Sequence, residues 1–117
     1  MLGFAPIALL FAASAPQPTA IRHLQTTNYK ITITEFCPQD FDCNHVTYRG
    51  VSSSGKSITL QGSHIWHDCP GTHDPCHPIG YRFKSGDVIY LITEDGFLQV
   101  TRGPKYLVNE QGTWDDR

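Results

Sequence analysis

The sequence has 117 residues, a formal net charge of −2 and a pI near 6.3. This length fits one domain. The balanced charge includes no basic run that could follow a phosphate backbone, so nucleic acid is not an expected partner. Four cysteines in so short a chain favour an exported protein braced by disulfides.

The N-terminal segment has the features of a signal peptide. An apolar run covers residues 2–13, and Ala-Ser-Ala at residues 13–15 has the small-x-small form that signal peptidase reads. The run is shorter than the roughly 20 residues that cross a bilayer. We therefore predict a signal peptide at residues 1–15, with cleavage between 14 and 20, and a periplasmic or extracellular mature chain without a membrane span. A buried N-terminal helix or a wrongly assigned start codon is the alternative, because no basic residue precedes the run and Pro16 follows the cleavage site.

The segment after the signal peptide changes character at Tyr29. Residues 16–28 include prolines and have no clear period, so we predict a linker or arm there. Residues 29–34, Tyr-Lys-Ile-Thr-Ile-Thr, alternate with period two and are rich in β-branched side chains, which is typical of a half-buried strand. Residues 29–117 are therefore predicted to form a single β domain.

The rest of the chain continues as short strands separated by tight turns. Asp95-Gly96 is one such turn, because this dipeptide readily adopts the positive-φ conformation of hairpins. No stretch has a helical period. The sequence therefore predicts an all-β fold, a small antiparallel meander of six to eight strands closed as a barrel or a sandwich. The further predicted strands are residues 45–49, 57–61, 81–84, 88–93, 97–101 and 106–108.

The four cysteines form two local pairs in the sequence. Cys37 and Cys43 are separated by five residues, and Cys69 and Cys76 by six. We favour these local disulfides, which would brace two surface loops, although the rival pairings would join the loops to each other. Each bridge would stabilise the fold by about 2 to 4 kcal/mol, and less for short loops.

The stretch 64–78, HIWHDCPGTHDPCHP, is the most distinctive part of the chain, and we predict a braced loop there. A tryptophan at the rim of a rigid loop suits a binding hot spot, with core packing as the alternative. The residues predicted to bind a partner are His64, Trp66, His67, Asp68 and His73.

The same stretch raises a metal-binding hypothesis. Imidazole groups are ligands for zinc and copper, and four histidines fall within this stretch. Their spacing fits no structural zinc pattern, and in an oxidising compartment the cysteines would already be paired. No cofactor is expected otherwise. The candidate ligands are His64, His67, His73 and His77.

One motif suggests nucleotide binding but has the wrong context. Residues 50–57, GVSSSGKS, satisfy the phosphate-loop pattern, which requires a helix directly after it. Residues 57–61 alternate as a strand instead, so a hairpin turn is favoured. No nucleophile elbow is present, and the paired carboxylates fall in turns or at the C-terminus. We therefore do not expect an enzyme.

These observations together predict a binding protein. A small disulfide-stabilised β domain can inhibit a secreted enzyme by inserting a rigid loop into its cleft. A periplasmic metal-binding protein and a non-catalytic envelope or effector protein are the alternatives. The segment YRF…SGDVIYLI…GFLQV…G…L, residues 81–107, is loosely similar to the small periplasmic lysozyme-inhibitor barrels in its rhythm of strands and glycines. This likeness implies a barrel with a protein partner, and it is not specific enough to assign the family.

Overall fold

The computed structural model describes residues 17–36, 45–68 and 75–115, except for the side chains of residues 67, 68 and 75–78. Within this part the chain forms nine strands. They are β1 (Ala20–Gln25), β2 (Tyr29–Glu35), β3 (Val46–Ser52), β4 (Ser57–Asp68), β5 (Pro75–Ser85), β6 (Val88–Thr93), β7 (Phe97–Arg102), β8 (Lys105–Gln111) and β9 (Thr113–Trp114).

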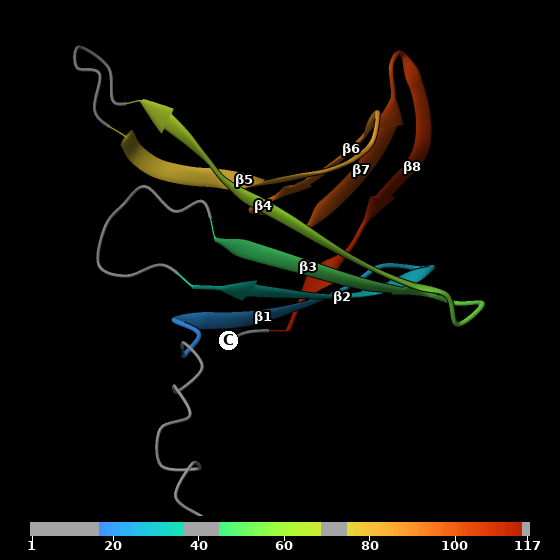
Figure 1. The fold of residues 1–117 in the computed structure, drawn as a ribbon, viewed down its shortest axis with the longest axis horizontal. Helices are drawn as coiled ribbons and strands as arrows, with labels where there is room; N and C mark the ends of the chain where they lie inside the picture. Colours follow the sequence, from blue (N-terminus) through green and yellow to red (C-terminus); the bar gives the residue numbers. More distant parts are fainter. Residues whose placement is uncertain (1–16, 37–44, 69–74, 116–117) are drawn as a thin grey trace, which may run out of the picture.

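The strands form one antiparallel sheet in the order β8-β7-β6-β5-β4-β3-β2-β1-β9. Because β9 follows β8 in the chain but pairs with β1 at the far side of the sheet, the sheet curls into a nearly closed barrel (Figure 1). The closing ladder is short and joins Leu24 and Gln25 to Trp114 and Thr113. The predicted all-β antiparallel meander is therefore confirmed, and it is curled as a barrel.

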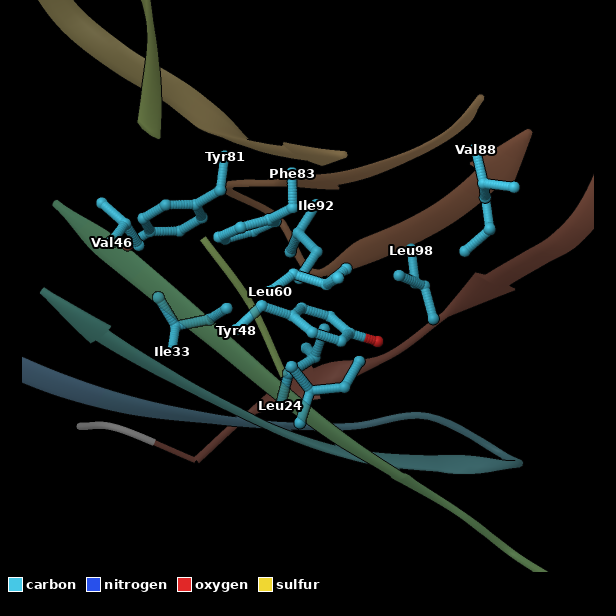
Figure 2. Packing of buried hydrophobic residues seen from close by; sticks show 12 residues of the cluster. Leu24, Ile33, Val46, Tyr48, Leu60, Tyr81, Phe83, Val88, Ile92 and Leu98 are labelled. Atoms are coloured by element: carbon cyan, nitrogen blue, oxygen red, sulfur yellow. The ribbon is translucent and has the colours of Figure 1, made fainter. Parts of the chain in front are cut away.

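Side chains alternate between the inside of the barrel and the solvent, as the two-residue period of a strand requires. In β2, Ile31 and Ile33 are buried while Lys30 is exposed. The inward-facing side chains meet in one apolar core (Figure 2), which consists of Leu24, Ile31, Ile33, Val46, Tyr48, Leu60, Tyr81, Phe83, Val88, Ile92, Leu98 and Val100.

The seam of the barrel depends on two glycines. Gly96 has φ +92°, and a Cβ there would lie 3.0 Å from the carbonyl oxygen of Gly112. The Gly112 amide donates to the Gly96 carbonyl at 2.9 Å. A positive φ and this close approach both favour glycine. The Asp-Gly turn predicted from the sequence is thus confirmed, and it also holds the β8–β9 corner against the β6–β7 turn.

Two predictions about element boundaries need correction. The predicted arm, residues 16–28, contains strand β1. With β1 and the two-residue β9, the described sheet has nine strands, more than the six to eight predicted. The predicted loop at 64–78 is largely strand, because β4 runs on to Asp68 and β5 begins at Pro75. By contrast, β4 begins at Ser57 directly after the turn, so the hairpin reading of the phosphate-loop pattern is confirmed.

The predicted disulfides lie outside the described residues, because Cys37, Cys43 and Cys69 are not among them and the side chain of Cys76 is not described. Both the local and the rival pairings stay predictions. In the part of the chain that the structure covers, no helix is long and apolar enough to cross a membrane.

Candidate functional site

The two longest strands project beyond the rest of the sheet. The β3–β4 ladder ends at Gly62, and the β5–β6 ladder begins at Gly80. Beyond these points β4 and β5 pair with each other alone among the described strands, and the hairpin extends to one side of the barrel (Figure 1). We call residues 63–68 and 75–79 the β4–β5 arm. Two register shifts, at Ile65/Trp66 and His67/Asp68, bend it relative to a regular ladder.

A cluster of polar side chains lies inside the barrel at the base of this arm. Glu35 is at its centre and accepts hydrogen bonds from Tyr81 Oη at 2.5 Å and from His64 Nε2 at 3.1 Å. The side chains of Glu35 and His64 are only 13% and 9% exposed. We call this group the Glu35 cluster: Arg22, Glu35, His64, Tyr81 and Glu94.

The strand pattern explains why these side chains meet. Glu35 continues the inward positions of Ile31 and Ile33 at the end of β2, and Tyr81 is opposite His64 in the β4–β5 ladder. Inward positions of neighbouring strands stack within reach of each other. The cluster is therefore the polar continuation of the apolar core toward the base of the arm.

The charges in the cluster hold Glu35 in its ionised form. Burial would raise the pKa of this carboxyl, but hydrogen bonds from His64 and Tyr81, with the positive charges of His64 and Arg22, outweigh burial and lower the pKa. An ionised carboxylate accepts hydrogen bonds and cannot donate them, so His64 Nε2 carries the proton that it shares with Glu35. Burial, above all, raises the pKa of Tyr81 well above its usual range, with its hydrogen bond to Glu35 contributing.

Arg22 connects the cluster to the seam of the barrel. Its Nη1 donates to Tyr81 Oη at 2.9 Å and to Glu94 Oε1 at 3.3 Å. The guanidinium also lies 3.9 Å from the centre of the Trp114 ring, a cation–π contact. Trp114 Nε1 in turn donates to the Glu94 carbonyl at 2.9 Å. These bonds link β1, β5, β9 and the β6–β7 turn into one rigid unit.

Trp66 extends the cluster onto the arm. Its ring stacks on His64 with centroids 5.6 Å apart and an interplanar angle of 27°. The side chain is half-buried. Among the described residues, two buried ring nitrogens, His64 Nδ1 and Trp66 Nε1, have no hydrogen-bond partner.

The structure therefore brings together two of the predicted binding residues, His64 and Trp66. His73 lies outside the described residues, and the side chains of His67 and Asp68 are not described. Sequence reasoning missed Glu35 and Tyr81, whose hydrogen bond spans 46 residues. A signal was present, because an acid at an inward position of a strand is unusual.

The metal hypothesis is not tested by this geometry. Of the four predicted ligands, His64 alone has a described side chain, and its Nε2 binds Glu35. Among the described residues, no group of three or more His, Cys, Asp or Glu side chains is placed to hold a metal ion. The zinc or copper site predicted at His64, His67, His73 and His77 stays a prediction.

Comparison with known proteins gives no indication of function, so the function must be inferred from the geometry of the site. Neither protein-family models, nor curated proteins, nor solved structures give a match to this chain. The site is a set of polar side chains that hold one another in place. Tyr81, Glu35 and His64 form a chain of hydrogen bonds, and the last of them supports a half-exposed tryptophan.

Proposed function

We propose that this protein is an exported binding protein whose β4–β5 arm contacts a macromolecular partner, and that the partner is a secreted enzyme that it inhibits. The observation that carries the proposal is the arm itself. It projects past the neighbouring strands and carries the half-buried Trp66 and the exposed Ile79, whose surface is 42% accessible. A projecting hairpin with apolar side chains is suited to enter a cleft on another protein.

The Glu35 cluster supports this proposal because it fixes the base of the arm. His64 is held by its bond to Glu35, and Trp66 rests on the His64 ring. An anchor that is already immobilised loses little conformational entropy on binding. Tryptophans in such rigid surroundings are enriched among the residues that dominate binding energy.

The test is a binding and inhibition assay with the oxidised mature chain. The first probes are lysozymes, chosen for the loose similarity of residues 81–107 to lysozyme-inhibitor barrels, followed by other secreted hydrolases. We expect inhibition of one enzyme, and we expect Trp66→Ala to weaken its binding about 30-fold, because hot-spot tryptophans contribute 2 kcal/mol or more.

Tyr106→Ala is the matched control, since Tyr106 is 62% exposed on β8, outside both the arm and the Glu35 cluster. Its affinity should equal that of the wild type. The proposed contact is wrong if Trp66→Ala binds as tightly as the wild type. The inhibitor function is wrong if no secreted hydrolase binds at micromolar concentration.

A further inference from the structure

A separate cavity opens inside the barrel, and no residue of the Glu35 cluster lines it. Its volume is about 480 Å³, within the range of small-molecule sites. We call it the Tyr48 pocket. The interior of a small β-barrel can hold one small ligand. Because its lining is separate from the Glu35 cluster and Trp66, ligand binding here is independent of a partner bound at the arm.

Two walls of the pocket differ in chemistry. The apolar wall comes from β7 and β8 and includes Leu98, Val100 and Val108. The opposite wall comes from β3, β4 and the turn between them, and it carries hydrogen-bond donors. Its polar members are Tyr48, Ser52, Ser54, Lys56 and Ser57.

Tyr48 is the most deeply buried of these polar residues, and its hydroxyl belongs to the polar wall. Tyr48 is 1% exposed, and its ring is held between Phe83 and Tyr90, with both centroids 5.3 Å away. The hydroxyl lies over Gly50, where a Cβ would come within 2.6 Å of it. No group in the described part of the chain forms a hydrogen bond with this hydroxyl. Because Tyr48 lines the pocket, its hydroxyl is available to donate a hydrogen bond to a ligand there.

Groups at the mouth add further donors. Ser52 Oγ and Ser54 Oγ are 2.8 Å apart, and the Lys56 amide donates to Ser52 Oγ at 3.3 Å. Whichever serine donates to the other, one hydroxyl hydrogen of the pair stays free. Lys56 is the one charged residue among those that line the pocket. Burial, with the neighbouring Tyr90 and Tyr29, raises the pKa of Tyr48, so its hydroxyl keeps its proton.

We infer that the Tyr48 pocket binds a small carboxylic acid with an apolar body, its carboxylate on the Tyr48–Lys56 wall and its body against Leu98, Val100 and Val108. A carboxylate accepts hydrogen bonds without donating any, which matches a wall of donors. One lysine balances a single negative charge. A phosphate group, with a charge of about −1.5 to −2, would leave charge uncompensated.

The experiment is a titration of the isotope-labelled full mature chain, followed by two-dimensional NMR. The probes are octanoate and 4-phenylbutyrate, each compared with its neutral amide and with inorganic phosphate. We expect saturable shifts of the backbone resonances of residues 48–58 and 98–108, and binding of an acid at least tenfold tighter than binding of its amide, because hydrogen bonds to a charged group are the stronger kind.

Substitutions separate the two parts of the polar wall. Tyr48→Phe keeps the ring and should weaken acid binding about tenfold. Lys56→Gln, at an exposed position where we expect the fold to be kept, should weaken acid binding about threefold, as the loss of an exposed ion pair does. Lys30→Gln is the matched control, because Lys30 is exposed and does not line this pocket, and it should bind like the wild type.

Three results would overturn the inference. The first is equal affinity for acid and amide. The second is a lack of saturable shifts at millimolar acid, or shifts that map elsewhere on the barrel. The third is tighter binding of phosphate than of either acid. If Tyr48→Phe changes the spectrum of the whole protein, the Lys56→Gln titration still decides between these outcomes.

Discussion

Two tyrosines face the inside of the same barrel, each 1% exposed, and their hydroxyl groups have opposite surroundings. Tyr81 Oη donates to Glu35 and accepts from Arg22. Tyr48 Oη has no hydrogen-bond partner in the described part of the chain and faces a cavity. Burial raises the pKa of both hydroxyls, so both remain protonated donors.

The difference shows how one barrel interior can serve two purposes. In the Glu35 cluster the protein supplies its own acceptor, Glu35, and the hydrogen bonds that it receives from His64 and Tyr81 fix the base of the β4–β5 arm. At the Tyr48 pocket no described residue supplies an acceptor, so the hydroxyl stays available to the proposed ligand. Figure 2 shows the two tyrosines on either side of the central apolar side chains, among them Phe83 and Leu60. The two regions share no lining residue, although Phe83 packs against both tyrosine rings.

The largest effect should follow from removing the acceptor at the centre of the cluster. Glu35→Ala leaves both His64 Nε2 and Tyr81 Oη without the carboxylate. Because removing one partner of a buried charged group leaves the other unpaired, we expect the free energy of unfolding to fall by about 3 kcal/mol. Urea unfolding followed by tryptophan fluorescence measures this change.

Glu110→Ala is the matched control for the loss of a carboxylate. Glu110 accepts hydrogen bonds from Asn28 at 2.7 and 3.2 Å, but these bonds are exposed to water. We expect its loss to lower the free energy of unfolding by about 1 kcal/mol or less. Equal losses for the two substitutions would mean that the Glu35 cluster is no more important than a surface contact.

A smaller effect should appear when the wild type is acidified. The pKa of Glu35 lies below its ordinary value of 4.5, so the ionised carboxylate stabilises the fold above that pH. This contribution is lost as the pH falls through the lowered pKa. Unfolding midpoints in urea between pH 6 and pH 3 should therefore fall more steeply in the wild type than in Glu35→Gln. Tyr48→Phe should keep the wild-type profile, and parallel profiles for the wild type and Glu35→Gln would contradict this role.

Much of the barrel could be predicted from the sequence because its strands and turns are indicated by patterns of neighbouring residues. The alternation in residues 29–34 and the turn at Gly96 depend on neighbours in the chain, and both were predicted correctly. Strand β1 was missed because Arg22 occupies an inward position. Its inward charge, satisfied by Tyr81 and Glu94, interrupts the apolar alternation that identifies a strand.

The sites were harder to predict because their parts are distant in the sequence. Glu35 meets His64 across 29 residues and Tyr81 across 46. His64 and Trp66 stood out in the sequence because many histidines and cysteines lie near them in the stretch 64–78. Nothing in the sequence placed Glu35 beside them. The Tyr48 pocket gave no sequence signal, since a tyrosine in a strand looks the same whether its hydroxyl is paired or not.

The most direct test of this account compares Tyr81→Phe with Tyr48→Phe by urea unfolding at pH 7. Each substitution removes one hydroxyl and keeps the ring. We predict that Tyr81→Phe lowers the free energy of unfolding by about 2 kcal/mol, because a charged acceptor loses its donor. Tyr48→Phe should stay within about 0.5 kcal/mol of the wild type, because the lost hydroxyl opens into the pocket and forms no hydrogen bond with any described residue. Equal losses, or a larger loss for Tyr48→Phe, would contradict the division of the barrel into a cluster that supplies the acceptor for Tyr81 and an open pocket that Tyr48 faces.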